Sequence, residues 1–182
     1  MDFFIARQPI FTAHKKLFAY ELLYRGTKTS RLSNTSGNKA TTSVLSSAFL
    51  TEGIEKISGL RPCFINFTRD LLLQNLPASF PKTLLVVEVL EDIPPTPEIV
   101  AICRKLRDDG YTIALDDFVY DRSLEPLIAI ADIIKFDFFL TPIDTLQKTL
   151  HRLARYNLES RIKRTLFGIH SQVLQEQRVS GH

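Results

Sequence analysis

Six side chains able to do chemistry recur through the first three quarters of the chain: Glu21, Asn66, Glu88, Asp116, Asp117 and Lys135. Carboxylate and amide oxygens without histidine or cysteine suit a hard cation, Mg²⁺ or Mn²⁺, rather than Zn²⁺. The adjacent acids Asp116 and Asp117 suit a two-ion arrangement that activates water for phosphoryl transfer. Lys135 would orient the nucleophile or neutralise charge on phosphorus. For any single acid, a role in capping a helix or simple exposure to solvent explains the residue equally well. These explanations become weaker when five oxygen-bearing residues all occupy the same kind of position in the predicted fold.

That shared position is the carboxyl end of a predicted strand. From Asn66 onward the polar residues follow one another at intervals of 19 to 28 residues, about one strand–helix unit each. Short apolar strands are expected at 63–67, 84–89, 111–115 and 133–136. Helices are expected at 40–55, 68–73, 96–110 and 146–153, with Thr68 and Thr96 as N-caps. An apolar hairpin is expected at 2–10 and 16–24, followed by a loop at 26–38.

Apolar strands separated by helices indicate a parallel sheet that is buried on both faces. In a β/α barrel, functional groups gather at the carboxyl ends of the strands. The sequence therefore predicts a TIM-type β/α barrel, and a doubly wound open sheet is the alternative fold.

The composition is that of a single soluble globular domain: 182 residues, 45% hydrophobic, with a formal net charge of +3. No apolar run approaches the roughly 20 residues that cross a bilayer, and an acidic second residue argues against a secretory signal. We expect a cytoplasmic protein in which Cys63 and Cys103 are reduced core thiols. Residues 151–182 carry six basic against two acidic side chains. Because the basic excess lies at one end, nucleic-acid polymers are not the expected partner.

A series of short motifs resembles the EAL domain, the family of cyclic di-GMP phosphodiesterases and their degenerate relatives. The motifs occur in the family's order over about residues 3 to 156: Gln8-Pro9-Ile10, Tyr20-Glu21-Leu22-Leu23-Tyr24-Arg25, Ile65-Asn66, Val87-Glu88-Val89-Leu90-Glu91, Leu115-Asp116-Asp117-Phe118 and Lys135-Phe136-Asp137. The opening motifs resemble the subgroup in which an EAL domain precedes an HDOD domain, and in which the EAL part often acts in signalling without catalysis.

The resemblance implies a role for each of these residues. Glu21, Asn66, Glu88 and Asp116 match the ligands of the first metal, and Asp117 matches a ligand of the second. Lys135 matches the lysine beside the attacking water. Gln8 and Arg25 match residues that contact the dinucleotide, with Arg25 near a phosphate, which suits the planar guanidinium.

Two departures from the family pattern affect the expected activity. Val119-Tyr120-Asp121-Arg122 follows Phe118, where active members have a glycine and a small-residue loop that supports the second metal. Valine does not adopt positive φ cheaply, so we expect a different loop path. A complete barrel takes roughly 250 residues, and the late glutamate and Gln-Gly motifs are not visible. We therefore divide the chain into a partial barrel at 1–156 and an atypical basic tail at 157–182, interpreted as truncated or frame-shifted.

These departures favour a degenerate, non-catalytic signalling domain. It would act through contacts with a protein partner or an HDOD domain, and through binding of cyclic di-GMP. An active metal-dependent phosphodiesterase is the alternative, and a structural fragment without a ligand is the third hypothesis. Exposed edges of an open barrel would need a cover, so a homodimer is a further expectation.

Overall fold

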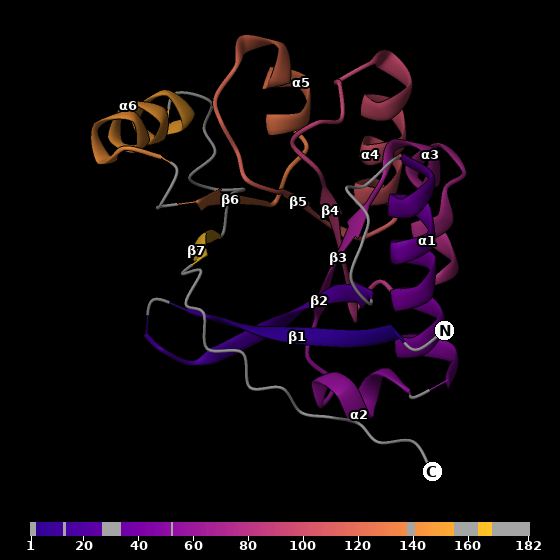
Figure 1. Ribbon diagram of the computed structural model, residues 1–182. Helices are drawn as coiled ribbons and strands as arrows, with labels where there is room; N and C mark the ends of the chain where they lie inside the picture. Colours follow the sequence, from indigo (N-terminus) through magenta and orange to yellow (C-terminus); the bar gives the residue numbers. More distant parts are fainter. Residues whose placement is uncertain are drawn as a thin grey trace.

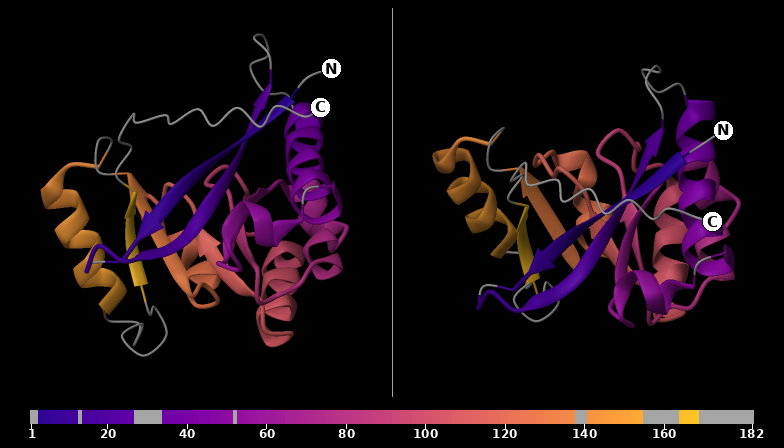
Figure 2. Two further views of the ribbon diagram at one scale, coloured as in Figure 1. Left: turned by 90° about the horizontal axis from the view of Figure 1, so that it is seen from below. Right: turned by 60° about the horizontal axis from the view of Figure 1, so that its bottom comes forward.

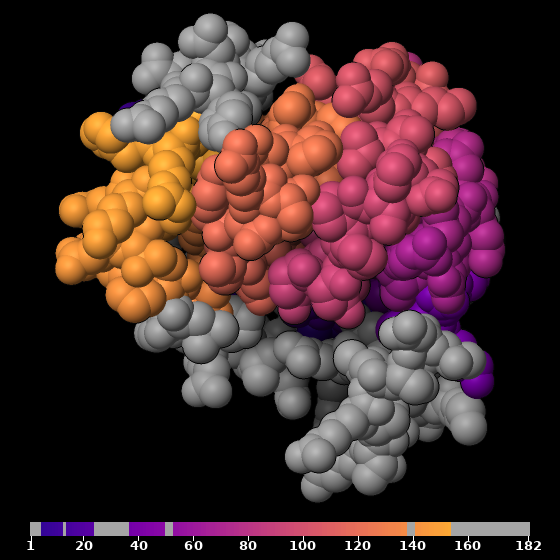
Figure 3. Space-filling model, turned by 90° about the horizontal axis from the view of Figure 1, so that it is seen from above, coloured from indigo at the N-terminus to yellow at the C-terminus, as the bar shows by residue number. Residues whose placement is uncertain are grey.

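The computed structural model describes residues 3–12, 14–26, 34–51, 53–137, 141–154 and 164–168. Its centre is one seven-stranded sheet whose strands lie side by side in sequence order. The sheet curls, and α1, α3, α4, α5 and α6 surround its outer side (Figure 1). Seen from above, the chain from α1 to α6 forms a continuous wall coloured from violet to orange (Figure 3). None of the helices in these ranges is long and apolar enough to cross a membrane.

The strands carry the predicted pattern of one antiparallel hairpin followed by parallel strands. β1 (Phe3–Phe11) and β2 (Leu17–Gly26) pair antiparallel, and each later strand pairs parallel with the one before it. The parallel strands are β3 (Cys63–Phe67), β4 (Leu85–Val89), β5 (Thr112–Leu115), β6 (Ile133–Asp137) and β7 (Arg164–Gly168). A doubly wound sheet reverses its strand order at a switch point. This order never reverses, so the barrel-type fold is confirmed and the alternative is wrong.

The hairpin brings the two ends of the sheet toward each other. β1 contacts β7, the last strand in the order, while β2 contacts the first long helix. Figure 2 shows the hairpin extending along the open side of the sheet from α1 to the neighbourhood of β7. The sheet is thus curled far enough for residues on its inner face to meet.

The helices pack between and beyond the strands. Their bounds are α1 (Asn34–Leu45), a π-helical turn η1 (Ser46–Thr51), α2 (Ile54–Ser58), α3 (Arg69–Leu73), a 3₁₀ turn η2 (Leu76–Ser79), α4 (Pro97–Asp108), a 3₁₀ turn η3 (Arg122–Leu124), α5 (Glu125–Ile128) and α6 (Ile143–Ala154). α1 begins at Asn34, inside the range predicted as loop. The predicted helix at 40–55 is interrupted at Gly53, whose φ of 81° suits glycine alone.

Polar contacts explain why the small polar residues at the start of α1 are helical. The Asn38 side-chain amide donates to Asp70, and the Thr68 hydroxyl donates to Asn38. Thr68 is also the predicted N-cap of α3, since its hydroxyl accepts from the Leu71 amide. Thr96 is the N-cap of α4, as predicted, although its side chain makes no capping hydrogen bond.

Strand β7 lies inside residues 157–182, which the sequence predicts to be an atypical basic tail. Residues 164–168 pair with β6 in parallel register, from Ile133 opposite Arg164 to Asp137 opposite Gly168. The sequence did not predict this strand, because its two end residues, Arg164 and Gly168, are not typical of strands and the residues around it are basic and polar. Residues 155–163 and 169–182 lie outside the described part, so the origin of the tail stays a prediction.

One apolar cluster lies on each face of the sheet. The larger cluster fills the space between the outer face of the sheet and the helices. The smaller cluster contains buried residues from β2 to β6 and no helix residue, so it lies on the inner face; its members are Ala19, Phe64, Val86, Ala114 and Ile133. Because side chains two positions apart on a strand share a face, the next inner layer consists of Glu21, Asn66, Glu88, Asp116 and Lys135.

Candidate functional site

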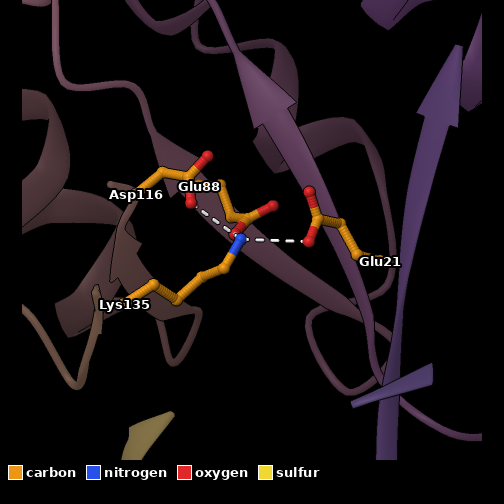
Figure 4. Close-up of polar contacts among 4 residues, drawn as sticks. All are labelled: Glu21, Glu88, Asp116 and Lys135. Carbon is orange, nitrogen blue, oxygen red and sulfur yellow. Dashed lines mark hydrogen bonds and ion pairs between the residues drawn. The ribbon is translucent and has the colours of Figure 1, made fainter. Parts of the chain in front are cut away.

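The inner polar layer brings side chains from four elements to one point. Glu21 comes from β2, Glu88 from β4 and Lys135 from β6, while Asp116 directly follows β5 (Figure 4). Parallel pairing sets this convergence, because Asn66 lies opposite Glu88 and Glu88 lies opposite Ala114 in the register. The expectation that the strand-end side chains meet at one mouth of the sheet agrees with this geometry.

The ammonium of Lys135 is the centre of the cluster. Its Nζ lies 3.0 Å from Glu21 Oε2, 2.7 Å from Glu88 Oε1 and 2.7 Å from Asp116 Oδ1. The side chains of these residues are at most 14% exposed, and that of Glu88 is 0% exposed. Three carboxylates facing one ammonium leave the ionised cluster with a formal charge of −2, which one divalent cation would neutralise.

Burial dominates the electrostatics of Glu88. Loss of solvent raises the pKa of its carboxyl well above the ordinary value, and repulsion from Glu21 and Asp116 adds to this effect against the attraction of Lys135. For Lys135, burial acts to lower the pKa, but the attraction of Glu88, Glu21 and Asp116 outweighs burial and holds the pKa above its usual range. The lysine therefore remains charged at neutral pH.

Two buried oxygen atoms on the paired residues Asn66 and Glu88 have no hydrogen-bond donor in the part of the chain that the structure describes. Asn66 Oδ1 and Glu88 Oε2 are both inaccessible to solvent and unpaired within the described residues. A buried acceptor without a partner costs about 1–3 kcal/mol. Glu21, Glu88 and Asp116 can each offer an oxygen within 4.8 Å of the others. Orphaned oxygens beside a carboxylate cluster fit a hard cation.

Asp117 lies on the solvent side of this cluster. Its backbone adopts a φ of 38°, and its side chain is exposed. Asp117, Asp116 and Glu91 form a second group of carboxylates close enough to share a cation, next to a pocket of about 210 Å³. Glu91 is not among the metal ligands predicted from the sequence. Its place three residues after Glu88, just past the end of β4, was the available signal.

The loop after Phe118 has no positive φ at the position of Val119. The positive φ falls on Asp117, and the side chain of Val119 is 69% exposed. The Tyr120 hydroxyl donates to Glu125 Oε1 at 3.1 Å, and the Arg152 guanidinium lies 5.2 Å from the centre of the Tyr120 ring. The loop is therefore tied to α5 and α6 by polar and cation–π contacts.

The two predicted dinucleotide contacts lie on the hairpin. Gln8 is directly opposite Glu21 in the antiparallel register, so its half-buried side chain projects to the same face as Glu21. Arg25 is opposite Phe4 near the end of β2, and its side chain lies outside the described part of the structure. Sequence reasoning missed Thr41, whose buried hydroxyl donates to the Asn66 carbonyl at 2.7 Å and ties α1 to β3 beside the site.

No family model matches the chain. Among curated proteins, the uncharacterized protein YuxH of Bacillus subtilis is 44% identical over 146 residues, which is 78% of this chain and 36% of YuxH. The cyclic di-GMP phosphodiesterase CdgJ of Vibrio cholerae is 34% identical over 142 residues, which is 78% of this chain and 33% of CdgJ. The chain thus spans about a third of the length of these relatives.

Solved structures show the same fold. The PaMucR phosphodiesterase in complex with c-di-GMP has a TM-score of 0.65 at 18% identity and covers 92% of this chain and 93% of its own. The Bacillus subtilis YkuI protein, with an EAL domain, in complex with c-di-GMP and calcium has a TM-score of 0.62 at 17% identity, covering 91% of this chain and 49% of its own. The resemblance found in the sequence is confirmed, and the chain has the fold of EAL domains.

Proposed function

We propose that this chain binds cyclic di-GMP together with a divalent cation, Mg²⁺ or Mn²⁺, and serves as a non-catalytic signalling domain. The observation that carries the proposal is the pair of buried, unpaired oxygens, Asn66 Oδ1 and Glu88 Oε2, beside a cluster with a formal charge of −2. A bound cation would satisfy both atoms, which otherwise carry the cost of burial without a partner.

The residues have distinct parts in this proposal. Glu21, Asn66, Glu88 and Asp116 hold the cation, and Asp117 together with Glu91 offers a place for a second one. A bound divalent cation supplies positive charge for the phosphates of the dinucleotide, which bare carboxylates would repel. Gln8 and Arg25, on the adjoining hairpin, contact the dinucleotide.

Two features disfavour hydrolysis: the contacts of Lys135 and the loop after Phe118. An ammonium has three N–H donors; that of Lys135 donates to Glu21 and Glu88 and forms an ion pair with Asp116. A lysine engaged in this way cannot orient a water molecule until at least one of these contacts is released. The exposed Asp117 and the loop held by Tyr120 leave a second cation poorly enclosed, which would cost rate because positioning supplies much of the acceleration.

An active cyclic di-GMP phosphodiesterase is the second candidate. The complete set of first-metal ligands with Lys135 beside it favours this function, as does the similarity to a relative named as a cyclic di-GMP phosphodiesterase. If the non-catalytic proposal holds, the signal passes through protein contacts instead. We propose an HDOD domain or a second copy of the chain as the partner.

Calorimetry with cyclic di-GMP, with and without Mg²⁺ or Mn²⁺, beside a hydrolysis assay, tests both candidates. Metal-dependent binding without turnover, lost in Glu21→Ala, is the expected result. Turnover that Glu21→Ala and Lys135→Ala both abolish would establish the enzyme instead. Absence of both binding and turnover would leave a domain without this ligand and contradict the proposal.

A further inference from the structure

Lys135 makes the contacts that a metal ion would make. Its ammonium is within 2.7–3.0 Å of one carboxylate oxygen each from Glu21, Glu88 and Asp116, which come from separate parts of the sheet. Mg²⁺ binds its oxygen ligands at about 2.0–2.1 Å and Ca²⁺ at about 2.3–2.6 Å. The three carboxylates are therefore gathered around a positive charge at a spacing slightly wider than a metal requires.

The same three carboxylates would serve both the lysine and a metal, and each already gives one oxygen to the ammonium. Figure 4 shows the ammonium of Lys135 lying among the three carboxyl groups, with all three contacts directed inward. Glu88 Oε2 and Asn66 Oδ1, on paired residues of β4 and β3, are further buried oxygens that have no partner within the described residues. A divalent cation bound there would lie next to a buried like charge, and like charges a few ångströms apart repel strongly where water is excluded.

We propose that Lys135 is an internal counter-cation that competes with the divalent metal for Glu21, Glu88 and Asp116. The ammonium holds the carboxylates together when no metal is bound, and it must release at least part of its contacts when the metal enters. Lys135 thereby lowers the affinity of the site for metal while it preserves the shape of the site. This inference rests on the proposed metal binding and adds a residue that regulates it.

Calorimetric titration with Mn²⁺ alone tests the proposal on the wild-type chain and on Lys135→Met, which retains most of the side-chain volume without the charge. Lys105→Met is the matched control, because Lys105 also pairs with a carboxylate, Asp109 at 2.8 Å, but its side chain is 63% exposed and belongs to α4. We expect Lys135→Met to bind Mn²⁺ at least about tenfold more tightly than the wild type. Lys105→Met should bind as the wild type does.

Each outcome has a separate meaning. Equal or weaker Mn²⁺ binding by Lys135→Met would overturn the competition while leaving the proposed metal site intact. Lack of Mn²⁺ binding by both proteins would overturn the metal site and the competition together. Binding seen only in Lys135→Met would be the strongest support for the competition.

A second measurement on the wild type covers the case in which Lys135→Met does not fold. An ammonium held by three carboxylates exchanges its protons slowly enough to give a lysine side-chain NMR signal, which Lys135→Arg would assign by its loss. We expect this signal to shift or vanish as Mg²⁺ is added. A signal that is unchanged at a Mg²⁺ concentration shown by calorimetry to saturate the protein would overturn the proposal.

Discussion

Removing the charge of Lys135 should destabilise the fold far more than removing the charge of an exposed lysine. In Lys135→Met, three buried carboxylates lose their shared cation, and the formal charge of the cluster changes from −2 to −3. Breaking a buried ion pair by removing one partner costs about 3–5 kcal/mol. Lys105 and Asp109 form an exposed pair four residues apart, and loss of such a pair costs about 0.5 kcal/mol or less.

The assay is urea unfolding at pH 8 in the presence of a chelator, with the free energy of unfolding compared among the wild type, Lys135→Met and Lys105→Met. We expect a loss of about 3–5 kcal/mol for Lys135→Met. Adding Glu88→Gln to that variant removes one of the three carboxylate charges left without the lysine. This second change should restore part of the lost free energy of unfolding. A loss below about 1 kcal/mol for Lys135→Met, equal to that of the control, would refute the electrostatic account of the cluster.

The cost of Lys135→Met should also depend on pH. Burial first, and repulsion from Glu21 and Asp116 next, raise the pKa of Glu88. A carboxyl with a raised pKa in the folded protein binds its proton more tightly when folded, so its contribution favours folding at low pH and is lost as the pH rises through that pKa. Without Lys135 the pKa rises further. The destabilisation should therefore be smaller at pH 5 than at pH 8, and the reverse order would contradict this reasoning.

Three further predictions follow from buried groups near the site. Phe64→Ala removes a fully buried ring from the apolar layer beneath the carboxylates. It should lower the free energy of unfolding by about 3–5 kcal/mol, and a loss under about 1 kcal/mol would show that this layer is not packed as described. Thr41→Val should cost about 1–2 kcal/mol by leaving the Asn66 carbonyl without its donor, and Thr41→Ser should restore most of it. Burial raises the pKa of both Cys63 and Cys103 to about 11. At pH 8 a thiol reagent should therefore react with them only as fast as the chain unfolds. A fast phase of reaction in native buffer would show that a thiol is accessible.

The strands were predictable because burial on both faces makes them apolar along their whole length. Residues 63–67 are a strand in both prediction and structure, and the hairpin and the parallel strands β4 to β6 lie within a residue or two of their expected places. Alternation of side chains along a strand then put Glu21, Asn66, Glu88 and Lys135 in one layer. The start of α1 was missed because Asn34 to Gly37 have low intrinsic helix propensity, and the contacts that stabilise this helix, from Asn38 to Thr68 and Asp70, join residues about 30 positions apart.

The details of the site depend on three-dimensional contacts that the sequence does not express. The sequence assigned Lys135 a role beside a water molecule, but it could not show that the ammonium lies within 2.7–3.0 Å of three carboxylates. Thr41 and Glu91 carry no motif of their own, and only the packing of α1 on β3 and the end of β4 brings them to the site. Strand β7 was hidden for a similar reason, since its pairing with β6 rather than its composition makes it a strand.

Paramagnetic broadening by Mn²⁺ at the side-chain amide of Asn66 tests the metal site most directly. In a labelled wild-type chain, we expect substoichiometric Mn²⁺ to broaden the Asn66 side-chain NMR signal more strongly than the side-chain signal of Asn75, which follows α3. The effect should be absent in Glu88→Ala. An Asn66 signal that survives a full equivalent of Mn²⁺, or that broadens equally in Glu88→Ala, would contradict the assignment of these oxygens to a cation.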